Sequence, residues 1–262
     1  MADFDAGRER WLARLDNLRN VVRQEVVARQ LADHVGPPPR QVLDIGCGQG
    51  TQSLRLAAAG HDVVGLDPSE QMLDAFRAAL ETEPAAVGAR ISLVQGDGLA
   101  APDLAGRSSY DVVLLHGVLM YLEDPAPMLR AAVECLRPGG LLSVVARNGA
   151  ALAMRPGMRG QWAAALDAFD ASTYRNEIGV DARADSLADL TARLHSLGLV
   201  EDAWYGVRTF SDRVSVDEPA PSDPRELAAL LDAEERAGRT DPYRGIATLV
   251  HVVARKPPAP VT

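Results

Sequence analysis

Residues 42–50, Val-Leu-Asp-Ile-Gly-Cys-Gly-Gln-Gly, place a short apolar run directly before three alternating glycines. The apolar run over residues 42–45 predicts a buried strand, and residues 54–59 predict the beginning of a helix. Glycines between them let the backbone turn sharply and approach a ligand without a Cβ in the way. The chain is therefore expected to form a strand, a tight turn and a helix whose free N–H groups face the turn.

Two acidic residues indicate what kind of ligand this turn binds. A second apolar run, residues 63–66, brings Asp67 to a strand end, where an acid can accept hydrogen bonds from both hydroxyls of a ribose. The glycine spacing is G-x-G-x-G, and Thr51 stands where the dinucleotide pattern G-x-G-x-x-G requires its third glycine. Asp44, just before the first glycine, would repel a pyrophosphate and suits an ammonium group. A nucleoside that carries an amino acid fits both acids, and S-adenosylmethionine is such a ligand.

Further motifs follow in the order typical of class I methyltransferases. Residues 91–94 predict a third strand that ends at Gly96-Asp97-Gly98, where that class has an acid or small polar group near the adenine. Residues 110–116 predict a fourth strand. Residues 136–140 predict a helix end and a tight turn before a fifth strand at 141–145. The chain thus resembles the class I S-adenosylmethionine-dependent methyltransferases, which implies an α/β fold with a doubly wound, mostly parallel, seven-stranded Rossmann-like sheet.

The remaining periodicity completes this fold. Apolar residues recur at helical spacing over residues 8–34, which predicts one or two amphipathic helices before the Gly-Pro-rich stop at 36–39. The other expected helices cover residues 51–59, 69–81, 125–136, 158–169, 187–197 and 224–237, and the last expected strands cover 201–210 and 246–254. We expect a single domain over residues 1–256, with a helical cap at 1–36, a helical insertion over the pocket at 148–184 and a mobile tail at 257–262.

Composition agrees with one cytoplasmic α/β domain. The chain has 262 residues, of which 47% are hydrophobic, enough for a large core. No apolar run approaches the roughly eighteen residues of a membrane span, and no signal peptide is evident, so no membrane association is expected. The two cysteines, Cys47 and Cys135, belong to no metal-ligand cluster, and no metal is expected. The net charge of −9 argues against broad nucleic-acid binding. Nothing in the sequence indicates the oligomeric state.

A narrower resemblance runs through residues 67–72, 115–119, 146–149, 205–210 and 243–257. These segments look like the bacterial tRNA 5-carboxymethoxyuridine methyltransferases, which esterify a carboxylate on a wobble uridine with the methyl group of S-adenosylmethionine. The resemblance implies a tRNA nucleoside as acceptor. The segment at residues 171–181 is nearly neutral where a lysine-rich stretch is expected, and this departure, together with the acidic net charge, favours a small-molecule acceptor as the alternative.

The resemblance also implies which residues contact the cofactor: Gly46, Cys47, Asp67, Gly98, Leu99 and His116. An arginine of the N-terminal helix contributes as well, with Arg19 as the best match and Arg23 as its substitute after a one-residue length difference. From the residues themselves, Asp44 is expected beside the amino group and Gly48 beneath the methionine part, and the class I resemblance implies that Asp97 lies near the adenine.

The acceptor is expected to meet a second set of residues. His116 either orients the cofactor, acts as a base or has a structural role. Arg208 either binds an acceptor carboxylate bidentately or pairs with Asp212 at the surface. The other residues expected to line the acceptor pocket are Tyr121, Asn148 and Tyr243. For Tyr121 the alternative is a core aromatic, and for Asn148 it is a turn residue.

The expected reaction is a direct in-line displacement of the methyl group from the sulfonium, which requires alignment and exclusion of water. A carboxylate acceptor is ionised at neutral pH and needs no base, so Arg208 or Arg147 would hold it. A hydroxyl or amine acceptor would instead require His116 as the base. The sequence leaves both open.

Overall fold

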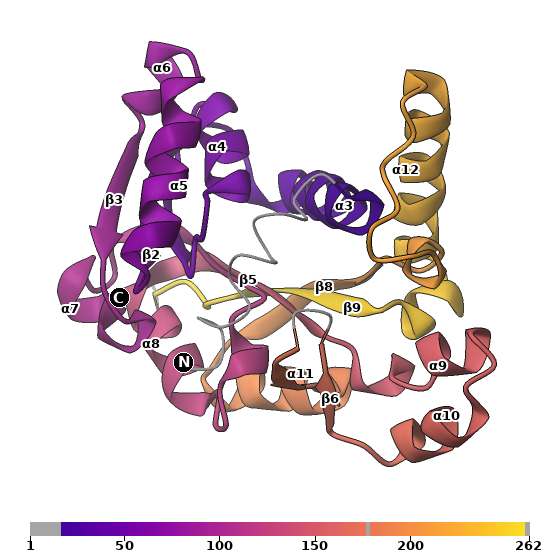
Figure 1. Cartoon of the computed structure of the whole chain (residues 1–262). Coiled ribbons are helices and arrows are strands. Elements are labelled where there is room, and N and C mark those ends of the chain that lie inside the picture. Colours follow the sequence, from indigo (N-terminus) through magenta and orange to yellow (C-terminus); the bar gives the residue numbers. More distant parts are fainter. Residues whose placement is uncertain (1–16, 177–178, 260–262) are drawn as a thin grey trace.

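The computed structural model describes residues 17–176 and 179–259. A seven-stranded sheet forms its centre, in the order β3-β2-β1-β4-β5-β9-β8 (Figure 1). The strands are β1 (Gln41–Ile45), β2 (Asp62–Asp67), β3 (Ile91–Gln95), β4 (Tyr110–His116), β5 (Leu136–Arg147), β8 (Val200–Val207) and β9 (Leu249–Arg255). Strands β1 to β5 pair in parallel, whereas β9 is antiparallel to both β5 and β8. The expected seven-stranded, mostly parallel, doubly wound sheet is therefore confirmed.

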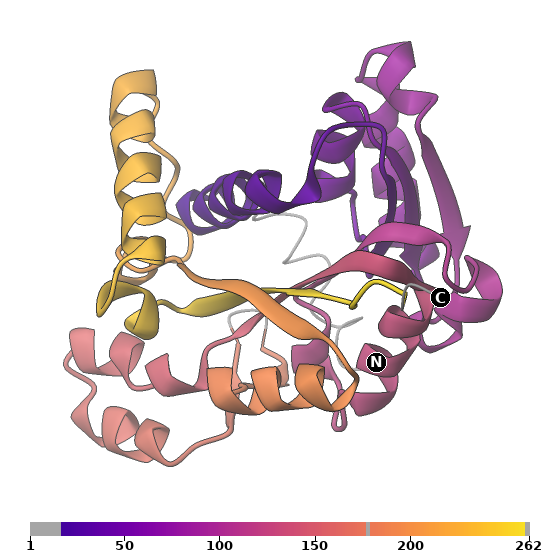
Figure 2. The same cartoon turned by 180° about the vertical axis from the view of Figure 1, so that it is seen from behind.

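Helices cover both faces of the sheet (Figures 1 and 2). One face is covered by α3 (Leu18–Val35), α4 (Thr51–Ala58), α5 (Glu70–Glu81) and α12 (Pro224–Arg239), and the other by α7 (Ala101–Leu104), α8 (Ala126–Cys135) and α11 (Leu187–Ser196). In β4, Val112 and Leu114 pack toward the first layer, and Val113 and Leu115 pack toward the second. Burial on both faces explains why the strands are continuous apolar runs. Within the described ranges, no helix is long and apolar enough to cross a membrane.

Several predicted elements differ at their ends. The chain at Pro138-Gly139-Gly140 does not form a separate turn, because it lies within β5, where the register against β4 shifts between Tyr110 and Val112. The expected helix over 158–169 begins later, as α10 (Trp162–Phe169), and a separate short helix α9 (Met154–Met158) precedes it, with Gly160 at a φ of 71° between them.

The C-terminal strands are shorter than expected. Strand β8 ends at Val207, because Arg208 has a φ of 65°, which is incompatible with an extended strand. Strand β9 begins at Leu249, and the preceding residues Tyr243–Ile246 form the 3-10 helix η5. Helix α3 begins at Leu18, with Asn17 as its N-cap, so most of the segment predicted before it lies outside the described residues.

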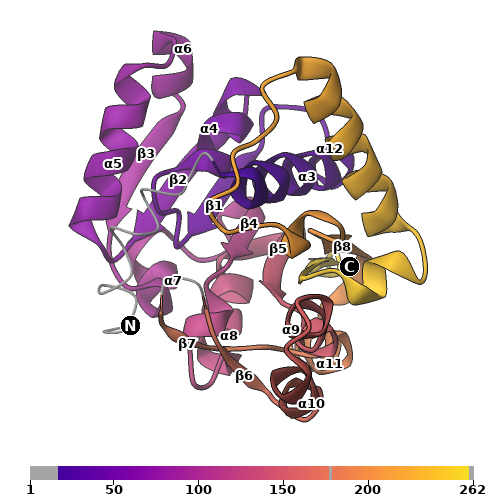
Figure 3. The same ribbon diagram turned by 45° about the vertical axis from the view of Figure 1, so that its right-hand side comes forward.

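The chain between β5 and α11 contributes a layer beside the sheet. It contains η3 (Gly149–Ala151), α9, α10 and a hairpin of β6 (Thr173–Arg175) and β7 (Asp181–Arg183). Figure 3 shows these elements on the side of α8 and α11, away from α3 and α12. The short α6 (Ala85–Gly88) follows α5 at the far edge of the sheet.

Candidate active site

A cavity of about 660 Å³ lies at the carboxyl ends of β1, β2, β4 and β5. The strand order reverses between β1 and β4, and parallel sheets bind ligands at this kind of position. Helix α3 contributes one wall of the cavity, while Arg155 of α9 and Tyr174 of β6 contribute the opposite one. The cavity is thus bounded by the sheet, the first described helix and the insertion.

The glycine loop forms the floor of one end of the cavity. Gly46, Gly48 and Gly50 all have positive φ angles, of 75°, 56° and 84°. A Cβ on Gly46 would lie 2.5 Å from Val118 Cγ2, and one on Gly50 would lie 2.2 Å from the ring of Phe76. The loop therefore requires glycine both for its backbone conformation and for close packing, as its sequence predicts.

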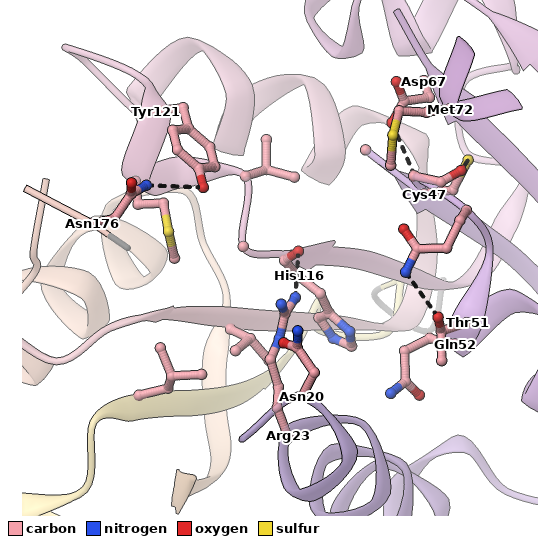
Figure 4. Close-up of a pocket in the computed structure, with 18 of the residues that line it drawn as sticks. Asn20, Arg23, Cys47, Thr51, Gln52, Asp67, Met72, His116, Tyr121 and Asn176 are labelled. Carbon is pink, nitrogen blue, oxygen red and sulfur yellow. Dashed lines mark hydrogen bonds between the residues drawn. The ribbon is translucent and has the colours of Figure 1, made fainter. Parts of the chain in front are cut away.

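Two buried carboxylates, Asp44 and Asp67, lie beside this loop, and Figure 4 labels the second of them. Asp67 accepts hydrogen bonds from the backbone N–H groups of Gly48 and Ser69, each at 2.9 Å, so its position is tied to the loop. Asp44 accepts a hydrogen bond from Ser53 Oγ at 2.7 Å, and burial raises its pKa to about 6. A buried carboxylate suits an ammonium partner, and a fixed acid at the end of β2 suits a ribose. The residues present therefore fit a nucleoside with an amino acid attached.

The cysteines have packing roles. Cys47 lies against Leu73 and Phe76, and burial raises the pKa of its thiol well above the usual range. Cys135 is buried in the core on the α8 side, and burial raises its pKa to about 11. Both are free thiols. Among the residues that the structure describes, no group of three His, Cys, Asp or Glu side chains is placed to hold a metal ion.

The two arginines predicted from the N-terminal helix point to different parts of the site. Arg23 donates to the backbone carbonyl of His116 at 3.5 Å, and its guanidinium lies 3.1 Å from a Cβ built on Gly117 (Figure 4). Arg19 instead donates to the carbonyls of Asp212, at 3.0 Å, and Val214. Burial lowers the pKa of both guanidiniums to about 10. Arg23, rather than Arg19, is thus the arginine beside the glycine-loop end of the cavity.

His116 lies at the end of β4 in a chain of buried polar groups. Its Nε2 is 2.7 Å from Ser143 Oγ, which is 2.8 Å from His251 Nε2, and His251 Nδ1 is 2.8 Å from Gln30 Oε1. Desolvation, with smaller contributions from His251 and Arg23, lowers the pKa of His116 well below its usual value. A lowered pKa makes His116 a weak base, and its Nε2 is held against Ser143, so both observations favour a structural role over proton abstraction.

Cationic side chains line the other end of the cavity. Arg155 binds Asp212 through two hydrogen bonds, Nε to Oδ2 at 2.6 Å and Nη2 to Oδ1 at 2.9 Å. Arg208 is buried and pairs with the same carboxylate through Nη2, while its Nε–H has no hydrogen-bond partner among the described residues. These arginines hold the pKa of Asp212 well below its usual range, against the effect of burial. Arg208 lines the cavity, and the pairing with Asp212 that was expected at the surface as its alternative is present as a buried pair.

Arg147 differs from its neighbours because it has no acidic partner. Its side chain is only 4% exposed, and its guanidinium carbon lies 4.9 Å from the centre of the Tyr174 ring. Its Nε has no hydrogen-bond partner, and no carboxylate of the described residues forms an ion pair with it. Burial lowers its pKa to about 10, so it remains charged at neutral pH. A buried, charged and unpaired guanidinium is costly unless an anion binds to it.

Four predicted site residues lie outside the cavity lining. Asp97 is the N-cap of the turn η1 (Gly98–Ala100) and accepts a hydrogen bond from the Leu99 N–H at 2.9 Å. Asp97 and Leu99 are exposed, and of these positions only the buried Gly98 lines the cavity. Asn148 is buried: its Nδ2 donates to the carbonyls of Gly245 and Ala247, and its Oδ1 accepts from the Ala150 N–H, which is the turn role expected as its alternative. Tyr243, expected at the acceptor pocket, also lies outside the cavity lining.

Tyr243 packs on Phe210, with ring centres 6.2 Å apart, and is 46% exposed. Tyr121 does line the cavity, and its hydroxyl accepts a hydrogen bond from Asn176 at 3.5 Å (Figure 4). The sequence did not predict the cavity contacts of Arg155 and Tyr174. Both residues lie in the insertion, where neither spacing nor periodicity indicates which side chains turn inward.

Comparison with known proteins identifies the family of this chain. Residues 43–144 match the family model described as a methyltransferase domain. The chain is 32% identical to the tRNA 5-carboxymethoxyuridine methyltransferase of Escherichia coli, over 92% of this chain and 88% of that protein. It is also 32% identical to the trans-aconitate 2-methyltransferase of Methylobacterium radiotolerans, over 78% of this chain and 76% of that protein.

A solved structure shows the same fold. The 1,6-didemethyltoxoflavin-N1-methyltransferase of Burkholderia thailandensis, with S-adenosylhomocysteine bound, superposes with a TM-score of 0.59 at 17% identity and covers 97% of this chain and 88% of its own. The cofactor of this protein is S-adenosylmethionine, as the glycine loop and its two acids indicate. The chain is an S-adenosylmethionine-dependent methyltransferase and belongs to the family of the tRNA 5-carboxymethoxyuridine methyltransferases.

Proposed function

We propose that this enzyme methylates a carboxylate, which binds between the guanidiniums of Arg147 and Arg208. The observation that carries this proposal is the buried Arg147, which has no acidic partner among the described residues. Arg208 supports it, because Asp212 occupies only part of its guanidinium and its Nε–H has no partner. A planar guanidinium matches a carboxylate through two parallel hydrogen bonds.

The chemistry of a carboxylate acceptor suits the rest of the site. Bound S-adenosylmethionine supplies an electrophilic methyl group on its sulfonium. A carboxylate is ionised at neutral pH, so the protein does not have to remove a proton from it. The lowered pKa of His116 makes that side chain a weak base, which suits this acceptor and does not suit a hydroxyl or an amine. The remaining task of the chain is to align the acceptor and to exclude water.

The acceptor that we propose is the carboxyl group of a modified wobble uridine in tRNA. The E. coli relative, which is similar over nearly the whole chain, takes its name from 5-carboxymethoxyuridine in tRNA. A small polycarboxylate is the second candidate, since the Methylobacterium relative is named for trans-aconitate. The net charge of −9 favours this second candidate, because broad tRNA binding usually requires a basic surface.

The proposal is tested with the variant Arg147→Met, which keeps most of the side-chain volume and removes the charge. Methylation of tRNA that contains 5-carboxymethoxyuridine, and of trans-aconitate, is measured by mass spectrometry of the products. We expect kcat/KM for the true acceptor to fall by about two orders of magnitude or more, the scale of one lost charged contact in a buried site. Calorimetric affinity for S-adenosylmethionine should remain unchanged, because the arginine contacts only the acceptor.

The matched control is Arg175→Met, which makes the same change at an exposed position of strand β6. Arg175→Met should change neither kcat/KM for the acceptor nor the affinity for S-adenosylmethionine. Unaltered turnover in Arg147→Met would refute the carboxylate site. Methylation of trans-aconitate but not of tRNA would show that the acceptor is a small polycarboxylate and not the wobble uridine.

A further inference from the structure

A buried carboxylate of α12 organises the backbone beside the cationic end of the cavity. Glu234 is fully buried, and its two oxygens accept hydrogen bonds from three successive N–H groups: Thr209 at 2.7 Å, Phe210 at 3.1 Å and Ser211 at 2.6 Å. Successive N–H groups that converge on one anion form a concave nest. Here the anion is a side chain of the protein itself, so the nest is part of the fold.

The conformation of this turn depends on that carboxylate. Arg208, which directly precedes the three N–H groups, has a φ of 65°, a left-handed conformation that is uncommon for a residue with a Cβ. Such a conformation costs on the order of 1–3 kcal/mol and persists only where its surroundings hold it. Three hydrogen bonds to a buried charge provide such a constraint.

The same turn carries the acid that arranges the neighbouring arginines. Asp212, one residue beyond the nest, pairs with Arg208 and with Arg155 of α9, and its backbone carbonyl accepts from Arg19 of α3. Three elements that are distant in the sequence therefore meet at one turn. The position of Arg208 depends on Glu234 at its backbone and on Asp212 at its side chain.

We propose that Glu234 is a positioning residue for acceptor specificity, which acts by holding the turn at residues 208–212 so that Arg208 faces the acceptor beside Arg147. This inference rests on the proposed function, because it assigns Glu234 a role at the carboxylate site. Glu234 does not line the cavity and touches neither substrate, so its effect passes through the backbone of the turn. Because Glu234 lies outside the cavity lining, its carboxylate can hold the turn without pairing with Arg147 or Arg208.

The test is Glu234→Gln, which keeps the shape of the side chain but places an NH2 group against at least one backbone N–H. We expect the acceptor KM to rise about tenfold, the equivalent of one weakened hydrogen bond to a charged group, with the affinity for S-adenosylmethionine unchanged. The amide resonances of residues 209–211 and the Nε resonance of Arg208 should shift. The matched control is Glu226→Gln, an exposed acid in the first turn of the same helix, which should change none of these.

An unchanged acceptor KM would overturn the positioning role, whether or not the resonances shift. Measurements that need no acceptor separate this result from failure of the carboxylate proposal: the Arg208 Nε resonance reports the position of the guanidinium whatever the acceptor is. Hydrogen exchange of the wild-type protein gives a further test if the variant fails to fold. Slow exchange at residues 209–211 supports the nest, and fast exchange there overturns it.

Discussion

At the scale of single residues, the site separates into an acidic end and a cationic end. Asp44 and Asp67 lie beside the glycine loop, whereas Arg147 and Arg208 lie beneath the insertion. The acids match the ammonium and ribose groups of the cofactor, and the arginines match a carboxylate acceptor. We expect this arrangement to direct the ammonium group to the first end and the acceptor carboxylate to the second, with Arg23 as an additional cation beside the glycine loop.

Asp67 provides a residue-scale prediction. In Asp67→Ala the cofactor should bind more weakly by about 1–3 kcal/mol, because a hydrogen bond to a charged acceptor is lost and the Gly48 N–H loses its partner. Isothermal titration calorimetry with S-adenosylmethionine measures this directly. An affinity equal to that of the wild type would show that Asp67 does not contact the cofactor.

Asp44 provides a pH prediction. Its carboxylate has a raised pKa of about 6, so it loses its charge as the pH falls through that value. If it binds the ammonium group, affinity for S-adenosylmethionine should be constant above about pH 7 and should decrease below pH 6. Calorimetry across this range tests the expectation. The variant Asp44→Asn should bind weakly and without this pH dependence, and a wild-type affinity that is flat down to pH 5 would contradict the assignment.

At the scale of elements, the join between β1 and α4 determines where the cofactor lies. Gly50 is the N-cap of α4 in a left-handed conformation, and the ring of Phe76 from α5 fills the space where a Cβ would be. The turn, the helix that follows it and a core aromatic of a third element are therefore interlocked. Gly88 of α6 lies in open space instead, and its φ is not positive.

These two glycines form a matched pair of variants. Gly50→Ala should destabilise the protein by about 2–4 kcal/mol, through backbone strain and overpacking against Phe76. Gly88→Ala should instead stabilise it by up to about 1 kcal/mol, because it removes a helical glycine without a clash. Urea denaturation followed by circular dichroism measures both. Equal effects of the two substitutions would refute the argument.

At the scale of the whole molecule, one cavity joins parts of the chain that are far apart in sequence. Its lining runs from Asn17 at the cap of α3 to Leu249 at the beginning of β9. A ligand that binds this cavity contacts groups that come together only in the folded state. Binding therefore stabilises the fold as a unit.

This linkage can be measured as a thermal shift. S-adenosylmethionine at 100 times its Kd should stabilise the native state by about 2.7 kcal/mol. For a domain of this size that corresponds to a rise in Tm of roughly 5–10 °C. Differential scanning calorimetry should show this shift in the wild type and a smaller one in Asp67→Ala at the same concentration. A Tm that does not change with cofactor concentration would contradict binding to the native cavity.

The sequence by itself determined the sheet and the glycine-loop end of the site. The strand ending at Ile45, the glycine loop and Asp67 are close in sequence, and local rules of chain geometry suffice to bring them together. The sequence offered the pairing of Arg208 with Asp212 only as an alternative at the surface, whereas the pair that forms is buried. Even here the strand end at Val207 was missed, since a positive φ at Arg208 has no local signature.

Only the tertiary structure decided which residues meet at the acceptor end. Arg147 closes β5, Arg155 and Tyr174 come from the insertion, and Glu234 acts from α12. In the folded chain Asn148 binds backbone carbonyls and Tyr243 packs on Phe210, so neither side chain lines the cavity. The physical reason is that burial and charge compensation depend on contacts between distant segments. Spacing along the chain specifies the direction of a side chain within one element but not what it faces after the elements pack.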